Sequence, residues 1–149
     1  MDKNKKVIDS FSGKYSFLSN FYPVEVVLDG VTYPTVEHAY QAAKTDNAKQ
    51  RLTIKQAITP GSAKRLGALL NLDAGWESSK VNIMRELLLQ KFADVLLRHL
   101  LLETGDAILV EGNHWGDVFW GKCDEVGENK LGKLLMEIRD ILRMHENNR

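Results

Sequence analysis

The stretch "VEVVLDGVTYPTVEHAYQAAK", residues 24–44, carries the two clearest structural signals in this chain. Asp29-Gly30 supplies two residues that tolerate positive φ between β-branched flanks, which is a strong short-range signal for a β-hairpin. Pro34 ends the hairpin, and Thr35 is a good N-cap for a helix over residues 36–45. The stretch therefore predicts a hairpin that leads directly into a helix.

The predicted helix has an unusual polar face. Glu37, Gln41 and Lys44 fall close to one line at about 100° per residue, and the apolar stripe beside them is thin. One interpretation is structural, in which Glu37 in the first turn and Lys44 near the end complement the helix dipole. The other interpretation is a site that presents a carboxylate, an amide and an amine.

The rest of the chain predicts mostly helices. We expect a short strand at 6–11, an ordered loop at 12–23, helices at 48–58, 62–70, 77–103 and 128–145, and a buried strand at 107–111. Ser62 is the expected cap of its helix, and Trp76 is expected in a turn. The predicted fold class is α+β: one mostly helical domain, residues 1–149, around a small β-sheet.

The composition excludes several classes of function. The chain has 149 residues, and Lys plus Arg (20) equals Asp plus Glu (20), so no net field favours nonspecific binding to nucleic acid or an anionic membrane. No run of about 18 apolar residues could span a bilayer, and the N-terminus lacks the apolar core of a signal peptide. A cytoplasmic protein is therefore expected.

The cysteine and histidine content argues against a metal site. Cys123 is the sole cysteine in the sequence, which rules out an intrachain disulfide and fits a reducing compartment. The four histidines show no HxxxH or HxH spacing. We expect neither a bound metal nor a cofactor.

A second unusual segment is "EGNHWGDVFWGKCDEVGENKLG", residues 111–132, which is both aromatic and rich in glycine. Trp115 and Trp120 offer flat faces for stacking, and long ordered loops often hold functional sites. Gly127 and Asn129 could present backbone amides to an anion at the start of the last helix. The alternative is structural, with Asp117 capping a turn and Trp120 filling the core.

Together the two segments predict a pocket with two carboxylates, Glu37 and Asp117, one amine, Lys44, and aromatic walls. Such a set can cleave a glycosidic bond, because one carboxyl protonates the leaving group while the other stabilises the oxocarbenium ion or activates water. Alternatively, Lys44 could capture a ring-opened sugar aldehyde as a Schiff base. The expected contacts to substrate are Trp76, Trp120, Asn20, Phe21, Tyr40 and Asn129.

The motifs resemble those of one known family. "FLSNFYP", "DGVTYPTVEHAYQAAK", "AKRLG", a tryptophan before "VNIMRELLLQKF", "LLETGD", "WG" and "LLMEIR" occur in an order that is similar to the YbiA-like, or NADAR, family. The resemblance runs from about Phe11 to Leu142. It implies a mostly helical α+β fold and places the family's acid, lysine, tryptophan and loop aspartate on Glu37, Lys44, Trp76 and Asp117.

The resemblance also implies N-glycosidase activity of one of two kinds. Some members hydrolyse ribosylamino-pyrimidine phosphates of riboflavin biosynthesis and release ribose 5-phosphate, while others remove ADP-ribose from modified guanine in nucleic acid. The sequence departs from the bacterial riboflavin-linked pattern at Cys123, where that pattern has a glycine, which puts the shape of the pocket in question.

Three hypotheses follow for function. A small phosphorylated N-riboside needs one local cationic site, for which the candidates are Lys44, Lys64, Arg65 and Lys80, so it is the expected substrate, and ADP-ribosylated guanine is the alternative. A non-catalytic ADP-ribose or nucleotide reader would not need both Glu37 and Asp117. A purely structural helical scaffold would leave the loop at 111–132 unexplained.

Overall fold

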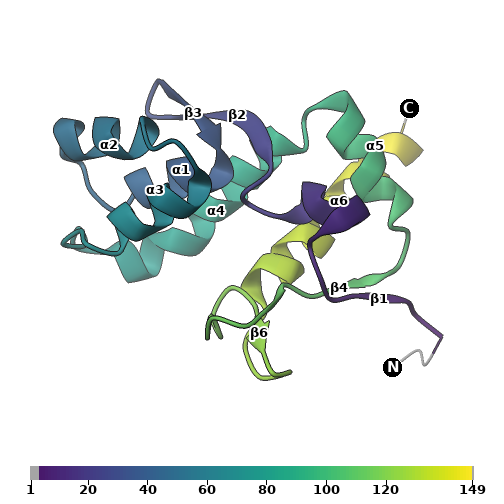
Figure 1. Ribbon diagram of the computed structural model, residues 1–149. Helices are drawn as coiled ribbons and strands as arrows, with labels where there is room; N and C mark the ends of the chain where they lie inside the picture. The colour runs from purple at the N-terminus through teal and green to yellow at the C-terminus, as the bar shows by residue number, and fades with distance from the viewer. Residues whose placement is uncertain (1–3, 149) are drawn as a thin grey trace. The chain divides into compact units, whose positions relative to one another are not determined.

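The computed structural model describes residues 4–148 and has an α+β fold in which helices predominate (Figure 1). These residues form two compact units, one made by Asn20–Lys91 and the other by the two ends of the chain, up to Ser19 and from Phe92 onward. Across residues 4–148 the strands pair into three separate two-stranded sheets. No helix within that range is long and apolar enough to cross a membrane. One domain with the boundaries 1–149 stays a prediction.

The predicted hairpin opens the Asn20–Lys91 unit. Strands β2 (Pro23–Leu28) and β3 (Val31–Thr35) pair antiparallel, with Leu28 opposite Val31. Asp29 and Gly30 both have positive φ, 49° and 80°, as a type I′ turn requires. The turn is tied to the helix Ala48–Lys55, because Arg51 in that helix donates a hydrogen bond from Nη1 to Asp29 Oδ2 at 2.7 Å. The hairpin prediction is confirmed.

Four helices complete this unit: α1 (Val36–Ala42), α2 (Ala48–Lys55), α3 (Pro60–Gly67) and α4 (Trp76–Lys91). Thr35 caps α1 as predicted, since its side chain accepts the amide of His38. The predicted cap of α3 was wrong. Thr59 caps this helix by accepting the amide of Ser62, and Pro60 occupies the first turn, where its fixed φ and missing N–H are tolerated.

Helix α1 lies at the centre of the unit, packed against both hairpin strands and against α2, α3 and α4 (Figure 1). All seven of its residues are buried. The polar face therefore does not meet solvent, and Glu37 lies in the first turn of the helix, where a carboxylate complements the helix dipole.

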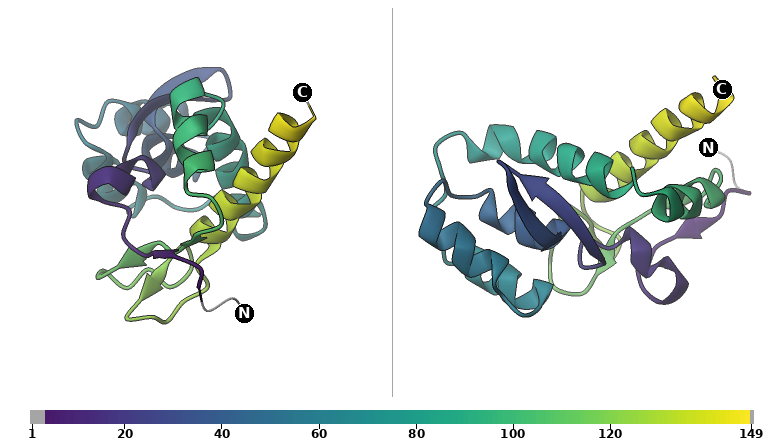
Figure 2. Two further views of the ribbon diagram at one scale, coloured as in Figure 1. Left: turned by 90° about the vertical axis from the view of Figure 1, so that its right-hand side faces the viewer. Right: turned by 90° about the horizontal axis from the view of Figure 1, so that it is seen from above.

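The terminal unit contains short strands and two longer helices. β1 (Val7–Ile8) pairs parallel to β4 (Ile108–Leu109), and β5 (Gly112–Asn113) pairs parallel to β6 (Lys122–Cys123). The helices are α5 (Val95–Glu103) and α6 (Lys130–Asn147), and the segment predicted as a loop before β2 contains a 3-10 helix, η1 (Gly13–Leu18). Figure 2 shows the light-green loop of β5 and β6 at the N-terminal end of the yellow α6.

The predicted single helix at 77–103 was wrong. The chain turns at residues 92–94, between α4 and α5, and the carboxylate of Asp94 accepts the amide of Leu97 to begin α5. Val95 and Leu96, which continue the apolar period of the predicted helix, are 84% and 61% exposed. An aspartate is a strong N-cap, so a new helix begins there although the apolar period continues.

Candidate active site

Glu37 and Gln41 are one helical turn apart on α1, and their side chains are joined. Gln41 donates a hydrogen bond from Nε2 to Glu37 Oε2 at 2.6 Å. Only 8% of Glu37 and 4% of Gln41 is exposed. A buried carboxylate is costly unless its oxygens are hydrogen-bonded, so the amide stabilises the ionised form of Glu37.

The histidine of the same motif is structural. His38 is buried, its Nδ1 lies 2.8 Å from Thr35 Oγ1, and its Nε2 lies 3.0 Å from the carbonyl oxygen of Ala57. A carbonyl can only accept, so Nε2 carries the proton and donates it to Ala57. Through these two contacts the ring links Thr35, before α1, to Ala57, after α2. A structural role thus accounts for the histidine beside Glu37.

Lys44 follows the end of α1 and is partly buried. Burial lowers the pKa of its ammonium group, the nearby Glu37 carboxylate opposes this by raising the pKa, and Lys64 and Lys80 lower it further. Its Nζ also lies 5.9 Å from the centre of the Tyr40 ring. Of the predicted cationic group, Lys44, Lys64 and Lys80 thus influence one another, whereas Arg65 hydrogen-bonds to Ser62 on the surface.

Trp76 and Tyr40 form an aromatic pair in the same unit. Their ring centres are 5.2 Å apart, with a tilt of 53° between the planes, and 6% of each residue is exposed. Trp76 is the first residue of α4, so its predicted place in a turn was wrong. The indole adds buried apolar surface to the unit. Tyr40 thus contacts both Trp76 and the ammonium group of Lys44.

Asn20 and Phe21 begin this unit and differ in their surroundings. The backbone carbonyl of Asn20 accepts the amide of Glu37 at 3.1 Å, and its buried side chain reaches Met84 Sδ at 3.6 Å. Phe21 is 41% exposed. The structure therefore brings Asn20 directly to the start of α1, beside Glu37.

Asp117 is fixed in the terminal unit by its own loop. Its Oδ1 accepts the amides of Phe119 at 3.1 Å and Trp120 at 2.9 Å. Asn113 closes the loop from the other side, since its Oδ1 accepts the amide of Asp117 and its Nδ2 donates to the carbonyl of Asp117. With Oδ1 engaged in this way, Oδ2 is the oxygen of Asp117 that remains for chemistry.

Asn113 is a site residue that the sequence analysis missed. The reciprocal bonds need an amide side chain four residues before the aspartate, and "NHWGD" has that spacing. Asn113 also donates to Glu111 Oε2 at 3.0 Å, which links the loop back to the residue before β5. Its buried position identifies it as the residue that sets the conformation of the Asp117 loop.

The start of α6, where an anion site was predicted, uses its first amides within the fold. The amides of Asn129, Lys130 and Leu131 donate to the carbonyls of residues 121, 119 and 120, in that order. The Asn129 side chain accepts the amide of Glu111 and donates to the carbonyl of Leu109. These groups are used by the fold, so neither they nor the Asn129 side chain are left to bind an anion.

Trp120 packs at the edge of the same loop. Its ring meets Phe119 edge-on, with ring centres 4.9 Å apart and planes at 90°. It is partly buried, while Trp115 is 61% exposed. Its role as a wall for substrate stays a prediction.

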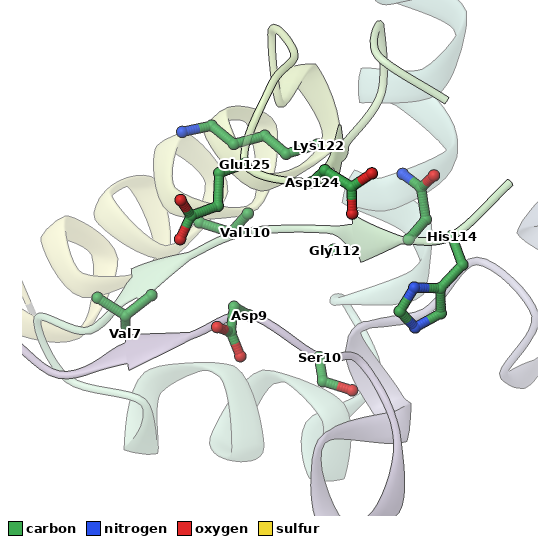
Figure 3. Close-up of a pocket in the computed structure, with 10 residues that line it drawn as sticks. Val7, Asp9, Ser10, Val110, Gly112, His114, Lys122, Asp124 and Glu125 are labelled. Atoms are coloured by element: carbon green, nitrogen blue, oxygen red, sulfur yellow. The ribbon is translucent and has the colours of Figure 1, made fainter. Parts of the chain in front are cut away.

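The terminal unit also contains an open pocket of about 630 Å³ between β1 and the loop of β5 and β6 (Figure 3). Its charged lining is acidic apart from Lys122, and it includes Asp9, Asp124 and Glu125. Asn113 lines it too, but the predicted catalytic residue of this unit, Asp117, does not. We therefore do not place the chemistry in this pocket.

Cys123 lies in a tight turn beside that pocket. Its amide and carbonyl pair with Val126, and the two residues between them, Asp124 and Glu125, have positive φ of 52° and 67°. The departure from the family pattern thus sits next to a type I′ turn built without glycine. Across residues 4–148, the structure groups no three histidine, cysteine, aspartate or glutamate side chains in a way that could hold a metal ion.

Comparison with known proteins places this arrangement in a family. A model of the NADAR domain matches residues 8–143, which is most of the chain. The chain belongs to the NADAR domain family. It is similar to the N-glycosidase YbiA of Escherichia coli K12, with 40% identity over 144 residues that cover 92% of this chain and 88% of that protein.

The chain is also similar to other proteins of known name or structure. The N-glycosidase Npun_R5314 of Nostoc punctiforme is 41% identical over 138 residues, covering 87% of this chain and 86% of that protein. The riboflavin biosynthesis protein VVA0006 of Vibrio vulnificus is 36% identical over 135 residues, and this chain spans about a third of it (36%). The NMR structure of E. coli YbiA has a TM-score of 0.82 and 35% identity, covering 99% of this chain and 94% of that one.

Proposed function

We propose that this NADAR domain is an N-glycosidase that hydrolyses the C1–N bond of a ribosylated base. The observation that carries the proposal is the buried Glu37, whose carboxylate accepts a hydrogen bond from Gln41 and acts on the charge of Lys44. An ionised carboxylate in a buried setting stabilises the positive charge that develops on a sugar ring during cleavage. Relatives named N-glycosidase, about 40% identical over most of their length, support the same activity.

Within this proposal Glu37 stabilises the oxocarbenium ion, Asp117 exchanges the proton with water or the leaving nitrogen, and Lys44 contacts the sugar phosphate. Asp117 suits proton exchange because one of its oxygens is held by two amides while the other oxygen is available. Trp76, Tyr40, Asn20, Phe21 and Trp120 are the proposed contacts to the substrate. We do not carry Asn129 into the proposal, since its side chain is used by the fold.

The proposed substrate is a phosphorylated ribosylamino-pyrimidine of riboflavin biosynthesis, with ribose 5-phosphate as a product. The similarity to a riboflavin biosynthesis protein supports this choice. The alternative substrate is ADP-ribosylated guanine in nucleic acid, and the zero net charge of the chain favours the smaller molecule. A cytoplasmic location fits hydrolysis of either substrate, because neither reaction needs an oxidising compartment.

A second mechanism is favoured by one observation, the lowered pKa of Lys44. A larger neutral fraction would let its amine attack C1 of a ring-opened ribosylamine, release the base amine and leave a Schiff base, which water then hydrolyses. Borohydride added during turnover would reduce that Schiff base and attach a pentose phosphate mass to Lys44. Absence of the adduct under turnover would leave the direct acid/base route.

The test of function offers the purified protein both substrates and detects ribose 5-phosphate and ADP-ribose by mass spectrometry. We expect ribose 5-phosphate, and we expect Glu37→Gln and Asp117→Asn to lose at least about 100-fold in turnover. Matched controls with the same chemical change at exposed positions are Glu25→Gln and Asp124→Asn. Near-parental turnover by both site variants would refute the proposal, and binding of ADP-ribose without any release would indicate a reader instead.

A further inference from the structure

Helix α3 comes very close to α1 at its last residue, Gly67. A Cβ added at Gly67 would lie 1.9 Å from Gln41 Oε1, 2.6 Å from its Cδ and 2.9 Å from its Cβ. Real Cβ atoms do not approach other atoms that closely, so any side chain at this position would displace the Gln41 amide. Gly67 is helical and is not among the glycines with positive φ, so the close approach is what requires a glycine there.

The Gln41 amide can point only one way in this space. Its Nε2 donates to Glu37, and its Oε1 is buried and has no hydrogen-bond partner among the described residues. A flipped amide would set Oε1 against the Glu37 carboxylate, where two acceptors repel. The buried, unpartnered Oε1 is destabilising, and this orientation is the one that directs Nε2 at Glu37.

We propose that Gln41 is a positioning residue that holds Glu37 ionised and in one rotamer. The missing side chain of Gly67 on α3 leaves the space that the Gln41 amide occupies. The inference rests on the proposed function, since it assigns Glu37 the role of a charged group rather than of a proton donor. A hydrogen bond from a neutral amide favours the ionised form of a carboxyl and opposes its protonation. This places the proton transfer on another group, for which Asp117 is the proposed residue.

Other titratable and charged groups lie on the elements packed against α1. The titratable and charged side chains of the elements packed against it are Glu25 of β2, Tyr33 of β3, Lys49, Arg51 and Lys55 of α2, Lys64 and Arg65 of α3, and Glu77, Lys80, Arg85, Glu86 and Lys91 of α4, with His38, Tyr40 and Lys44 on α1 or at its end. Lys44 interacts with Glu37 through charge. Arg51 is directed to the carbonyl of Thr45 and to Asp29, and Lys80 pairs with Glu77. A substitution of Gln41 alters none of these side chains. A shift in the titration midpoint of Glu37 therefore reports the effect of the Gln41 amide.

The test measures the titration of Glu37 directly, by carboxyl ¹³C NMR, with the signal assigned by its loss in Glu37→Gln. Gln41→Met keeps the length of the side chain but cannot donate, and we expect it to raise the midpoint of Glu37 by about 1 pH unit. Gly67→Ala should raise it similarly, because it displaces the same amide. Gly61→Ala is the matched control, since an added Cβ at this other glycine of α3 would make ordinary contacts, the nearest at 3.7 Å.

Activity supplies the second measurement. The acid limb of the pH profile of kcat/KM should move upward by the same amount in both variants, and kcat should fall on the order of 10- to 100-fold, because the carboxylate is no longer held in one position. If Gly67→Ala does not fold, the double variant Gly67→Ala with Gln41→Gly should regain folding, because it removes all three Gln41 atoms that the added Cβ would meet.

An unchanged Glu37 midpoint in Gln41→Met would overturn the inference, and so would a midpoint in Gly67→Ala that matches Gly61→Ala. Raised midpoints with an acid limb that follows them support it. A parent protein that releases neither product refutes the proposed function separately. Raised midpoints would in that case still support the action of Gln41 on Glu37, because the NMR titration needs no substrate.

Discussion

Lys91, the last residue of α4, is fully buried, and we expect it to make the stability of the protein depend on pH. None of it is exposed, and burial lowers the pKa of its ammonium group from 10.5 to about 7. Its Nζ lies 5.7 Å from the centre of the Tyr22 ring, a cation–π contact that favours the charged form and offsets only part of the cost of burial. The perturbation we consider is Lys91→Met, which keeps the apolar stem and removes the titrating group.

The sign follows from proton binding. Between about pH 7 and pH 10.5 the unfolded chain holds a proton on Lys91 that the folded chain has lost, so the free energy of unfolding rises with pH in this window. Each pH unit inside the window is worth up to about 1.4 kcal/mol. From about pH 7 to about pH 9.5 the parent should therefore gain on the order of 3 kcal/mol from this group, allowing for the rounded ends of the titration.

The assay is urea unfolding at these two pH values for the parent, Lys91→Met and Lys49→Met. Lys49 is an exposed lysine on α2 and controls for a change of charge at the surface. The measured quantity is the difference in unfolding free energy between Lys91→Met and the parent, which cancels the titration of all other groups. We expect this difference to shift by about 3 kcal/mol in favour of the parent as the pH rises. A difference that is equal at both pH values, as expected for Lys49→Met, would refute the reasoning.

Five further substitutions test three local features: the Asp117 loop, the turn at Glu125 and the cap of α3. Asp117→Asn retains an oxygen for the amides of the loop and should keep the unfolding free energy within about 0.5 kcal/mol while turnover is lost, whereas Asp117→Ala should also lower stability by about 1–2 kcal/mol in thermal unfolding. Glu125→Gly, which places a glycine at φ 67° after Asp124, should raise the unfolding free energy by up to about 1 kcal/mol; a lower melting temperature would contradict this. Thr59→Ala should cost about 1 kcal/mol in urea unfolding, and Ser62→Ala clearly less, because the cap of α3 is Thr59; the reverse order would restore the cap predicted from sequence.

The sequence predicted well those elements whose signals are local. Asp29-Gly30 determines the hairpin by the backbone freedom of two residues, and Thr35 begins α1 with its own side chain. The last helix was also predicted, at 128–145, and its residues Leu131, Leu134, Leu135 and Ile138 are buried. In each case the signal lies in the residues of the element itself or directly beside it.

Features set by competition or by packing were harder to predict. The apolar period continues through residues 77–103, but the capping strength of Asp94 begins a second helix there. The burial of Glu37 and Gln41 depends on helices that surround α1, which the period of α1 itself does not reveal. The bonds of Asn113 to Asp117 could have been suggested by their spacing, but many Asn and Asp pairs share that spacing without such bonds.

The bonds between the β5–β6 loop and α6 have a consequence for protein engineering. Residues 119–121 supply the carbonyls for the first amides of α6, and Asn129 ties Leu109 and Glu111 to the same place. Hydrogen bonds within the segment from Leu109 to Leu131 thus hold the loop to the start of α6, while the amide of Val110 donates to the carbonyl of Ile8 in β1. A chimera that exchanges this whole segment between relatives should fold, whereas one joined inside it leaves helix amides without their acceptors. Because the tip at Asp124-Glu125 takes no part in those bonds, insertions there can be varied without moving Asp117.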